Sequence, residues 1–222
     1  MREVAIILGR GGSAGGSRKN LRKVGEHTLI RQAVLKCEAA RLIDEVYVST
    51  ESMEIAKESG CANIIARPDE LSTDEAKTDD AVRHAIEVIG SDPPIDVVAV
   101  VQCTAPLMTI DELDGTIRRL IDMQAGCAVA VAPTDALQVT EDSIGRLHGI
   151  GLDLKTFAHR RQEREQAYEI CGSIWAMDCK MFLRTGNAYG GTVVAHKVRR
   201  RLEIDSLADL DDARAMVRQN RT

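Results

Sequence analysis

Short apolar runs that recur along the chain constrain its fold more than any other feature. The runs are rich in β-branched residues and cover residues 4–8, 46–48, 63–66, 97–101, 127–132, 173–177 and 192–195. Their apolar residues are nearly continuous rather than alternating with polar ones, which is typical of strands buried on both faces of a mostly parallel sheet. We therefore expect a sheet that helices cover on both sides.

Stretches with helical periodicity separate these runs. They cover residues 28–41, 79–89 and 111–123, and Ser206 followed by Asp209 resembles the capping box of a last helix. Alternating strands and helices over 222 residues predict one doubly wound α/β domain spanning 1–222. Residues 136–166 are polar and irregular, and we expect them to form an excursion from the sheet.

Composition and charge exclude several partners. The net charge of -5 and the aromatic content of 3% disfavour nucleic acid and anionic membranes. No apolar stretch approaches the ~18 residues that a membrane span needs, and the N-terminus lacks a signal-peptide pattern. The six cysteines form no CxxC pair, which indicates reduced thiols in a cytoplasmic protein.

A glycine-rich basic loop follows the first apolar run. Residues 9–20 read GRGGSAGGSRKN, and Arg10, Arg18 and Lys19 supply positive charge. Glycine lets successive backbone N–H groups face one concavity and lets the backbone approach a ligand closely. The loop therefore predicts a bound phosphate group, and five glycines with three cations are more than a plain turn requires.

Two common phosphate-binding motifs do not fit this loop. A Walker A loop needs Gly-Lys-Ser/Thr, where this chain has Gly16-Ser17-Arg18. A dinucleotide fingerprint needs an acidic residue about 20 residues on, at the end of the next strand. Here that strand ends later, near Glu51, and Arg10 and Lys19 suit a triphosphate better than a nicotinamide dinucleotide.

Other polar residues stand at strand ends, where α/β sheets bind ligands. Arg67 ends a run and precedes Pro68, and such an arginine is either a surface ion-pair partner or a ligand contact. Gln102 ends the 97–101 run and needs a polar partner there.

A pair of carboxylates lies near the C-terminus. Glu203 and Asp205 alternate along an extended segment, so both project to one side, as Mg²⁺ ligands beside a triphosphate would. The alternative makes Glu203 an ion-pair partner of Arg199, Arg200 or Arg201, and Asp205 part of a helix cap.

Five segments in order resemble the acylneuraminate cytidylyltransferase family, which makes CMP-activated sialic and related nonulosonic acids. They are ILGRGGSAGGSRKN from residue 7, RPDELSTDEAKT at 67–78, VQCTAPL at 101–107, RRQ at 160–162 followed by YEICGSIW, and LEIDSLADL at 202–210. The resemblance covers about 200 of the 222 residues. It implies a sheet of the nucleotide-diphospho-sugar transferase type, in which the excursion mediates a homodimer.

The resemblance also implies roles for individual residues. It assigns CTP binding to Leu8, Arg10, Gly11, Gly12, Ser13, Lys19, Asn20, Arg67, Ala76 and Thr78. It assigns the acidic sugar to Gln102, Arg161, Tyr168 and Trp175, and Mg²⁺ to Glu203 and Asp205. Lys19, Arg10 and Arg161 are the implied catalytic cations, and Arg161 serves its own or the partner's site. The Arg160-Arg161 run alone would read as a solvated face.

The expected activity joins CMP from CTP to the anomeric hydroxyl of an acidic keto-sugar and releases pyrophosphate. The family's loop lysine is Ala14 here, its loop proline is Ser17, and its usual asparagine is Cys171. These departures leave open an eight-carbon keto acid as acceptor, or another nucleotide with a sugar 1-phosphate. A noncatalytic nucleotide-binding protein is the alternative from another class.

Overall fold

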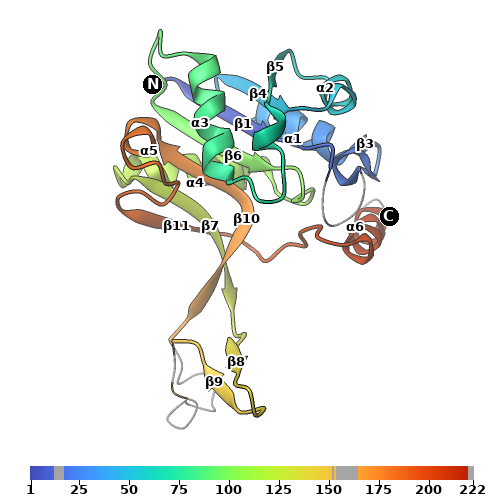
Figure 1. Ribbon diagram of the computed structural model, residues 1–222, viewed down its shortest axis with the longest axis vertical. Helices are drawn as coiled ribbons and strands as arrows, with labels where there is room; N and C mark the ends of the chain where they lie inside the picture. The colour runs from blue at the N-terminus through green and yellow to red at the C-terminus, as the bar shows by residue number, and fades with distance from the viewer. Residues whose placement is uncertain (13–17, 152, 154–164, 220–222) are drawn as a thin grey trace.

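A computed structural model of the chain describes residues 1–12, 18–151, 153 and 165–219. Its body is built on a seven-stranded sheet in the order β11-β7-β10-β6-β1-β4-β5 (Figure 1). In chain order these strands are β1 (Glu3–Leu8), β4 (Glu45–Thr50), β5 (Asn63–Ala66), β6 (Val97–Gln102), β7 (Cys127–Thr134), β10 (Ala167–Asp178) and β11 (Val193–Lys197). Only β10 runs antiparallel to its neighbours, β6 and β7.

Helices cover both faces of the sheet, which confirms the doubly wound α/β architecture. One face carries α1 (Leu29–Glu38), α2 (Met53–Ser59), α4 (Ile110–Asp122) and α6 (Leu207–Gln219). The other carries α3 (Thr78–Ile89) and α5 (Cys179–Thr185). Each face has its own cluster of buried apolar side chains.

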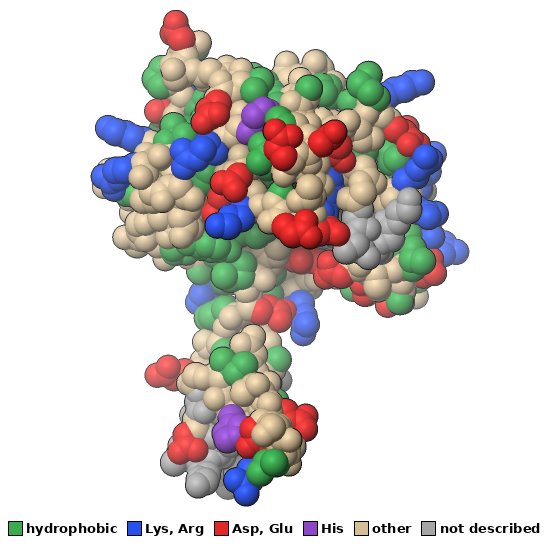
Figure 2. Space-filling model, in the orientation of Figure 1, with side chains coloured by type: hydrophobic (Ala, Val, Ile, Leu, Met, Phe, Trp, Pro, Cys, Tyr) green, Lys and Arg blue, Asp and Glu red, His purple; other side chains and the backbone are tan. Residues whose placement is uncertain are grey.

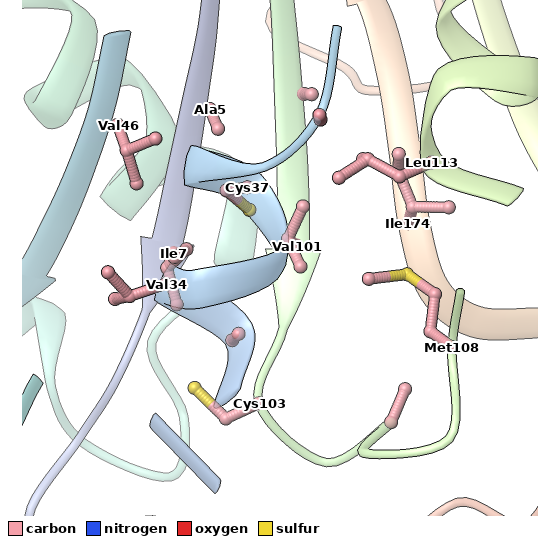
Figure 3. Close-up of a cluster of buried hydrophobic side chains, with 14 of the residues drawn as sticks. Ala5, Ile7, Val34, Cys37, Val46, Val101, Cys103, Met108, Leu113 and Ile174 are labelled. Atoms are coloured by element: carbon pink, nitrogen blue, oxygen red, sulfur yellow. The ribbon is translucent and has the colours of Figure 1, made fainter. Parts of the chain in front are cut away.

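The larger cluster shows how the helices attach to the sheet. Leu113 of α4 and Ile174 of β10 are both fully buried and lie beside each other (Figure 3). Cys37 of α1 and Cys103 after β6 are buried in the same cluster, where each acts as a small apolar residue. All six cysteines are free thiols.

Smaller elements complete the chain. A hairpin of β2 (Lys23–Val24) and β3 (His27–Thr28) follows the 3₁₀ turn Lys19–Leu21, and a second 3₁₀ turn covers Asp69–Leu71. The hairpin of β8 (Val139–Glu141) and β9 (Leu147–Gly149) lies at the end of an arm that β7 and β10 extend away from the body (Figure 1). This arm corresponds to the expected excursion. No helix among the described residues is long and apolar enough to cross a membrane.

The strand order fixes where a ligand site is expected. From β1 the chain builds outward through β4 and β5, and then returns to place β6 on the other side of β1. Leu8 and Gln102, the last residues of β1 and β6, lie side by side in the parallel register. Ligands of open α/β sheets bind at such a switch point, beyond the carboxyl ends of the strands.

Candidate functional site

A pocket opens at this switch point, and we call it the polar pocket. Its volume is about 310 Å³ and it is lined by Leu8, Arg10, Arg67, Leu71, Thr73, Asp74, Ala76, Lys77, Thr78, Ala81 and Gln102. The lining brings together six of the residues that sequence analysis assigned to CTP and sugar. They come from the ends of β1 and β6, the residues just after β1 and β5, the start of α3 and the loop before it.

Arg67 is buried at the base of the polar pocket, at 7% exposed. Its Nη2 pairs with Glu51 Oε2 at 3.1 Å and its Nε donates to Ser72 Oγ at 3.0 Å. Arg67 is thus both an ion-pair partner and a pocket residue, but it is no surface arginine. These contacts fix the guanidinium group before a ligand binds, so ligand binding does not have to order it.

The start of the glycine loop lies across the pocket from α3. Arg10 Nη1 pairs with Asp74 Oδ1 at 2.6 Å and donates to Thr73 O at 3.1 Å. The buried Asn20 donates from Nδ2 to Arg10 O at 3.0 Å, so its side chain supports the loop backbone. Gly12 is exposed, and Ser13 lies outside the described residues.

Lys19 connects the glycine loop to the C-terminal segment. Its Nζ donates to Ile204 O at 2.8 Å and lies 3.9 Å from Asp205 Oδ1. The backbone N–H of Ile204 donates in turn to Thr104 O at 2.8 Å, just after β6. Ile204 is fully buried, and these two bonds fix the backbone between Glu203 and Asp205.

The two carboxylates of this segment have different surroundings. The side chain of Asp205 is 88% exposed, whereas Glu203 is partly buried and accepts the Gly172 N–H at 2.6 Å. Burial raises the pKa of Glu203, and the nearby Asp205 and Glu169 raise it further. The surroundings of Glu203 therefore disfavour its negative charge, and a bound cation would stabilise that charge.

Among the described residues Glu203 makes no ion pair with Arg199, Arg200 or Arg201, and Asp205 enters the helix cap through its backbone N–H. Arg200 pairs with Glu169 and Arg201 with Glu112, rather than with Glu203. The start of α6 is held by Asp209, whose Oδ2 accepts the N–H groups of Asp205 and Ser206, so the Asp205 side chain is no cap. Among the described residues no group of three or more possible metal ligands occurs, so protein atoms alone make no closed metal cage there.

A second pocket, which we call the apolar pocket, adjoins the first. Its volume is about 480 Å³ and it is lined by Glu75, Ala76, Lys77, Thr78, Asp79, Val82, Val100, Trp175, Met177, Ala188 and Tyr189. The two pockets share Ala76, Lys77 and Thr78 at the start of α3. Trp175 Nε1 donates to the Tyr189 hydroxyl at 2.7 Å, so an aromatic pair forms one wall.

The remaining predicted residues lie elsewhere. Tyr168 is the second residue of β10, Lys197 Nζ lies 4.8 Å from its ring centroid, and it lines neither pocket. Arg161 lies outside the described residues. Sequence analysis missed Glu51 and Tyr189, because their roles depend on contacts with distant residues.

Taken together, the geometry suits a reaction between a polyanion and a partly apolar molecule. Arg10 and Arg67 supply cations in the polar pocket, and Lys19 supplies a third beside the exposed Asp205 of the C-terminal segment. Such an arrangement catalyses phosphoryl transfer by positioning the reactants and neutralising charge on oxygen.

Comparisons with known proteins find relatives that match the chain over nearly its whole length. Curated relatives include a pseudaminic acid cytidylyltransferase of Campylobacter jejuni, 26% identical over 99% of this chain and 98% of that protein. An N-acylneuraminate cytidylyltransferase of Escherichia coli is 24% identical over 94% of this chain and 49% of its own length.

Solved structures show the same fold. CMP:2-keto-3-deoxy-manno-octonic acid synthetase complexed with CTP superposes with a TM-score of 0.72 at 16% identity, covering 99% of this chain and 100% of its own. A 4-diphosphocytidyl-2C-methyl-D-erythritol synthase from Anaerococcus prevotii gives 0.67 at 14% identity over 98% of both chains.

The profile of one sequence family matches more than half of the chain. That family is described as Cytidylyltransferase, and the match covers residues 4–143, from β1 to just beyond β8. The matched region contains the glycine loop, the polar pocket and Gln102. The chain therefore belongs to the cytidylyltransferase family.

Proposed function

We propose that this protein transfers CMP from CTP to the anomeric hydroxyl of a nonulosonic acid and releases pyrophosphate. The observation that carries the proposal is the lining of the polar pocket. Residues assigned to CTP from separate sequence segments converge there on the switch point of the sheet. The curated relatives, a pseudaminic acid and an N-acylneuraminate cytidylyltransferase, support this acceptor class.

The polar pocket would hold the nucleotide. Thr78 and the backbone near Ala76 can meet the edge of a pyrimidine, and Arg10 and Lys19 can meet the triphosphate. In an in-line displacement the oxygen of the sugar hydroxyl forms a bond to the α-phosphorus and gives up its proton to solvent, while the bond to the pyrophosphate oxygen breaks. Lys19 would neutralise charge that grows on the leaving group.

The apolar pocket would hold the acceptor. It adjoins the polar pocket at Ala76–Thr78, so a sugar in it would lie beside a nucleotide there. Val82, Val100, Trp175, Met177 and Ala188 offer apolar surface. Such a wall favours acceptors that carry methyl or acyl groups over those with a fully hydroxylated chain.

We also propose that Glu203 and Asp205 bind Mg²⁺ together with the triphosphate. Two carboxylates with the remaining ligands from phosphate and water match the preferences of this ion. The raised pKa of Glu203, caused by burial and by neighbouring carboxylates, supports the fit. When bound, Mg²⁺ supplies charge neutralisation at the triphosphate oxygens.

The arm supports a homodimer. Exposed apolar side chains gather on it: Leu137, Val139, Ile144, Leu147 and Ile150 are each more than 40% exposed. In Figure 2 green side chains stand out on the arm below the body. We propose that this arm packs against a second copy and brings Arg161 to one of the two sites. Free thiols throughout fit the reducing cytoplasm as the compartment.

The direct test measures pyrophosphate release by the purified protein with each of the four ribonucleoside triphosphates, Mg²⁺ and a panel of acidic keto-sugars. The panel includes sialic, legionaminic and pseudaminic acids and an eight-carbon keto acid. We expect release with CTP and a nine-carbon acid. Release with only the eight-carbon acid would change the acceptor, and release with GTP alone would overturn the nucleotide.

No release with any pair would refute the enzymatic proposal. Calorimetric titration with CTP would then test the alternative of a noncatalytic nucleotide-binding protein. The same titration on a catalytically active sample reports CTP affinity apart from turnover.

A further inference from the structure

Glu51 links two parts of the polar pocket that are far apart in the sequence. It lies just after β4, at the turn into α2. Its Oε1 accepts the Gly11 backbone N–H at 2.5 Å, and its Oε2 pairs with Arg67 Nη2 at 3.1 Å. One carboxylate therefore holds both the start of the glycine loop and the guanidinium at the base of the pocket.

Burial and charge make this link strong. The side chains of Glu51 and Arg67 are 17% and 5% exposed. Burial alone raises the pKa of Glu51, but the Gly11 N–H and Arg67 outweigh it, and the pKa lies below its usual range. The Glu51 carboxylate is thus ionised near neutral pH, and a charge-assisted pair shielded from water is stronger than an exposed one.

The glycine loop is shaped to accept this carboxylate. A Cβ at Gly11 would lie 3.1 Å from Ser52 Cβ and 3.3 Å from Glu51 Oε1, closer than ordinary contact. Glycine at position 11 thus lets the loop backbone approach the start of α2. The Gly11 amide, expected at a phosphate, is here a donor to Glu51.

We propose that Glu51 is a positioning residue that sets Arg67 for recognition of the cytosine base while it anchors the phosphate loop. The inference rests on the proposed function and deepens it. Arg67 uses Nε for Ser72 and Nη2 for Glu51. A guanidinium has five N–H donors, so it keeps capacity for a ligand in the pocket.

A fixed Arg67 would make the pocket selective for cytosine over uracil, because the two bases differ at N3. Cytosine presents two acceptors, O2 and N3, to a donor such as a guanidinium. Uracil carries an N–H donor at N3, so a fixed guanidinium would place one hydrogen-bond donor against another. Rigid placement of Arg67 therefore penalises UTP, whereas a mobile Arg67 could turn away from the mismatch.

The test is Glu51→Gln, which keeps the size of the side chain and removes its charge. The Gln amide oxygen can still accept the Gly11 N–H, but its NH₂ group would face Arg67 with donors. We expect the ratio of kcat/KM for CTP over UTP to fall about tenfold or more. The KM for CTP should rise more than kcat falls. Glu58→Gln is the matched control, because Glu58 is exposed on α2.

A second variant separates positioning from folding. Glu51→Asp keeps the charge but is shorter by one methylene, so we expect a selectivity between those of Glu51→Gln and the wild type. Thermal unfolding and calorimetric CTP binding are measured on each variant.

The results of these measurements support or overturn the inference as follows. Lost selectivity in Glu51→Gln, with partial rescue in Glu51→Asp, supports the inference. Equal losses with CTP and UTP, or unchanged selectivity in a folded Glu51→Gln, overturn it. A wild type that turns over no triphosphate contradicts the proposed function instead. CTP binding that Glu51→Gln leaves unchanged would then overturn the inference separately.

Discussion

Lys19 stands where the glycine loop meets the C-terminal segment, and its contacts define its role. Its side chain is 15% exposed, and its ammonium group donates to the backbone oxygen of Ile204. It therefore sits at a fixed place beside Asp205 rather than sampling solvent. Preorganised charge of this kind acts on the transition state more than on the bound substrate.

We predict that Lys19→Gln lowers kcat about 100-fold and changes the KM for CTP little. The reason is that, in the proposed reaction, negative charge grows on the departing pyrophosphate and Lys19 would neutralise it. Steady-state kinetics of pyrophosphate release would measure both constants. Lys23→Gln, at an exposed position on β2, is the control. An unchanged kcat in Lys19→Gln would exclude Lys19 from the chemistry.

Glu203 gives a prediction for stability against pH. A carboxyl group whose pKa is raised on folding binds its proton more tightly in the folded state. Its contribution is therefore unfavourable above the raised pKa, and the penalty disappears as the pH falls below the ordinary value of 4.5. Glu203→Gln, which keeps an oxygen for the Gly172 N–H, should raise the Tm at pH 7 and lose this advantage toward pH 4.

Thermal unfolding of both proteins from pH 4 to pH 8 checks this expectation. Without divalent cations the difference in Tm should grow with pH through the range just above 4.5. With Mg²⁺ and CTP, the wild type should gain stability and Asp205→Asn should gain less. A Glu203→Gln protein that is less stable than the wild type at pH 7 would contradict the expectation that the ionised Glu203 destabilises the folded protein.

At the scale of elements, α4 secures the connection between α1 and β4 through a buried carboxylate. Asp114, which is 5% exposed, accepts the N–H groups of Arg41 and Leu42 at 3.0 Å each. Its Oδ2 also pairs with Arg41 Nε at 3.2 Å. These bonds satisfy two backbone N–H groups of the turn between α1 and β4, which lie outside both elements.

Asp114→Ala is expected to lower the free energy of unfolding by about 2–4 kcal/mol, because two partly buried N–H groups lose the acceptor that the buried Asp114 provides. Urea denaturation measures the loss. The control Asp122→Ala, at an exposed position of the same helix, should change it by less than about 0.5 kcal/mol. Equal small effects of the two substitutions would show that water replaces the carboxylate.

The sequence predicted the long elements well, and physical reasons explain what it missed. Continuous apolar runs located the strands of the sheet, and helical periodicity located α1, α3 and α4. The helices α2 and α5 have seven residues each, too few for a periodic pattern to stand out. The antiparallel direction of β10 and its register shift between Ile170 and Trp175 depend on the pairing partners, which periodicity does not encode.

Sequence motifs predicted the pocket residues that lie within them, but not the residues outside them. Leu8, Arg10, Arg67, Ala76, Thr78 and Gln102 were named from sequence and line one pocket. Glu51 was not, because its role comes from contacts with residues 40 and 16 positions away. Tyr189 was missed for a similar reason, since only the fold brings it to Trp175.

At the scale of the whole molecule, the arm is the feature that a monomer does not explain. Ile144 and Leu147 are 67% and 58% exposed. Apolar side chains gathered on a projecting hairpin are costly in water unless another surface covers them. The two-fold symmetry usual for a dimer would bury the arms of both copies.

We predict that light scattering coupled to gel filtration gives a dimer for the wild type. Ile144→Asp with Leu147→Asp should shift it toward a monomer and lower turnover per chain. The control Met53→Asp places the same charge at a side chain that is 85% exposed on the body. A monomeric wild type with full activity would rule out a shared site.

The most direct test of the proposed CMP transfer is phosphorus NMR of a reaction with CTP, Mg²⁺ and pseudaminic acid. We expect the three CTP signals to be replaced by one pyrophosphate signal and one phosphodiester signal, in equal molar amounts. That result would place the bond change at the α-phosphorus. Orthophosphate and CDP as products, or CTP that stays intact with every acceptor, would contradict it.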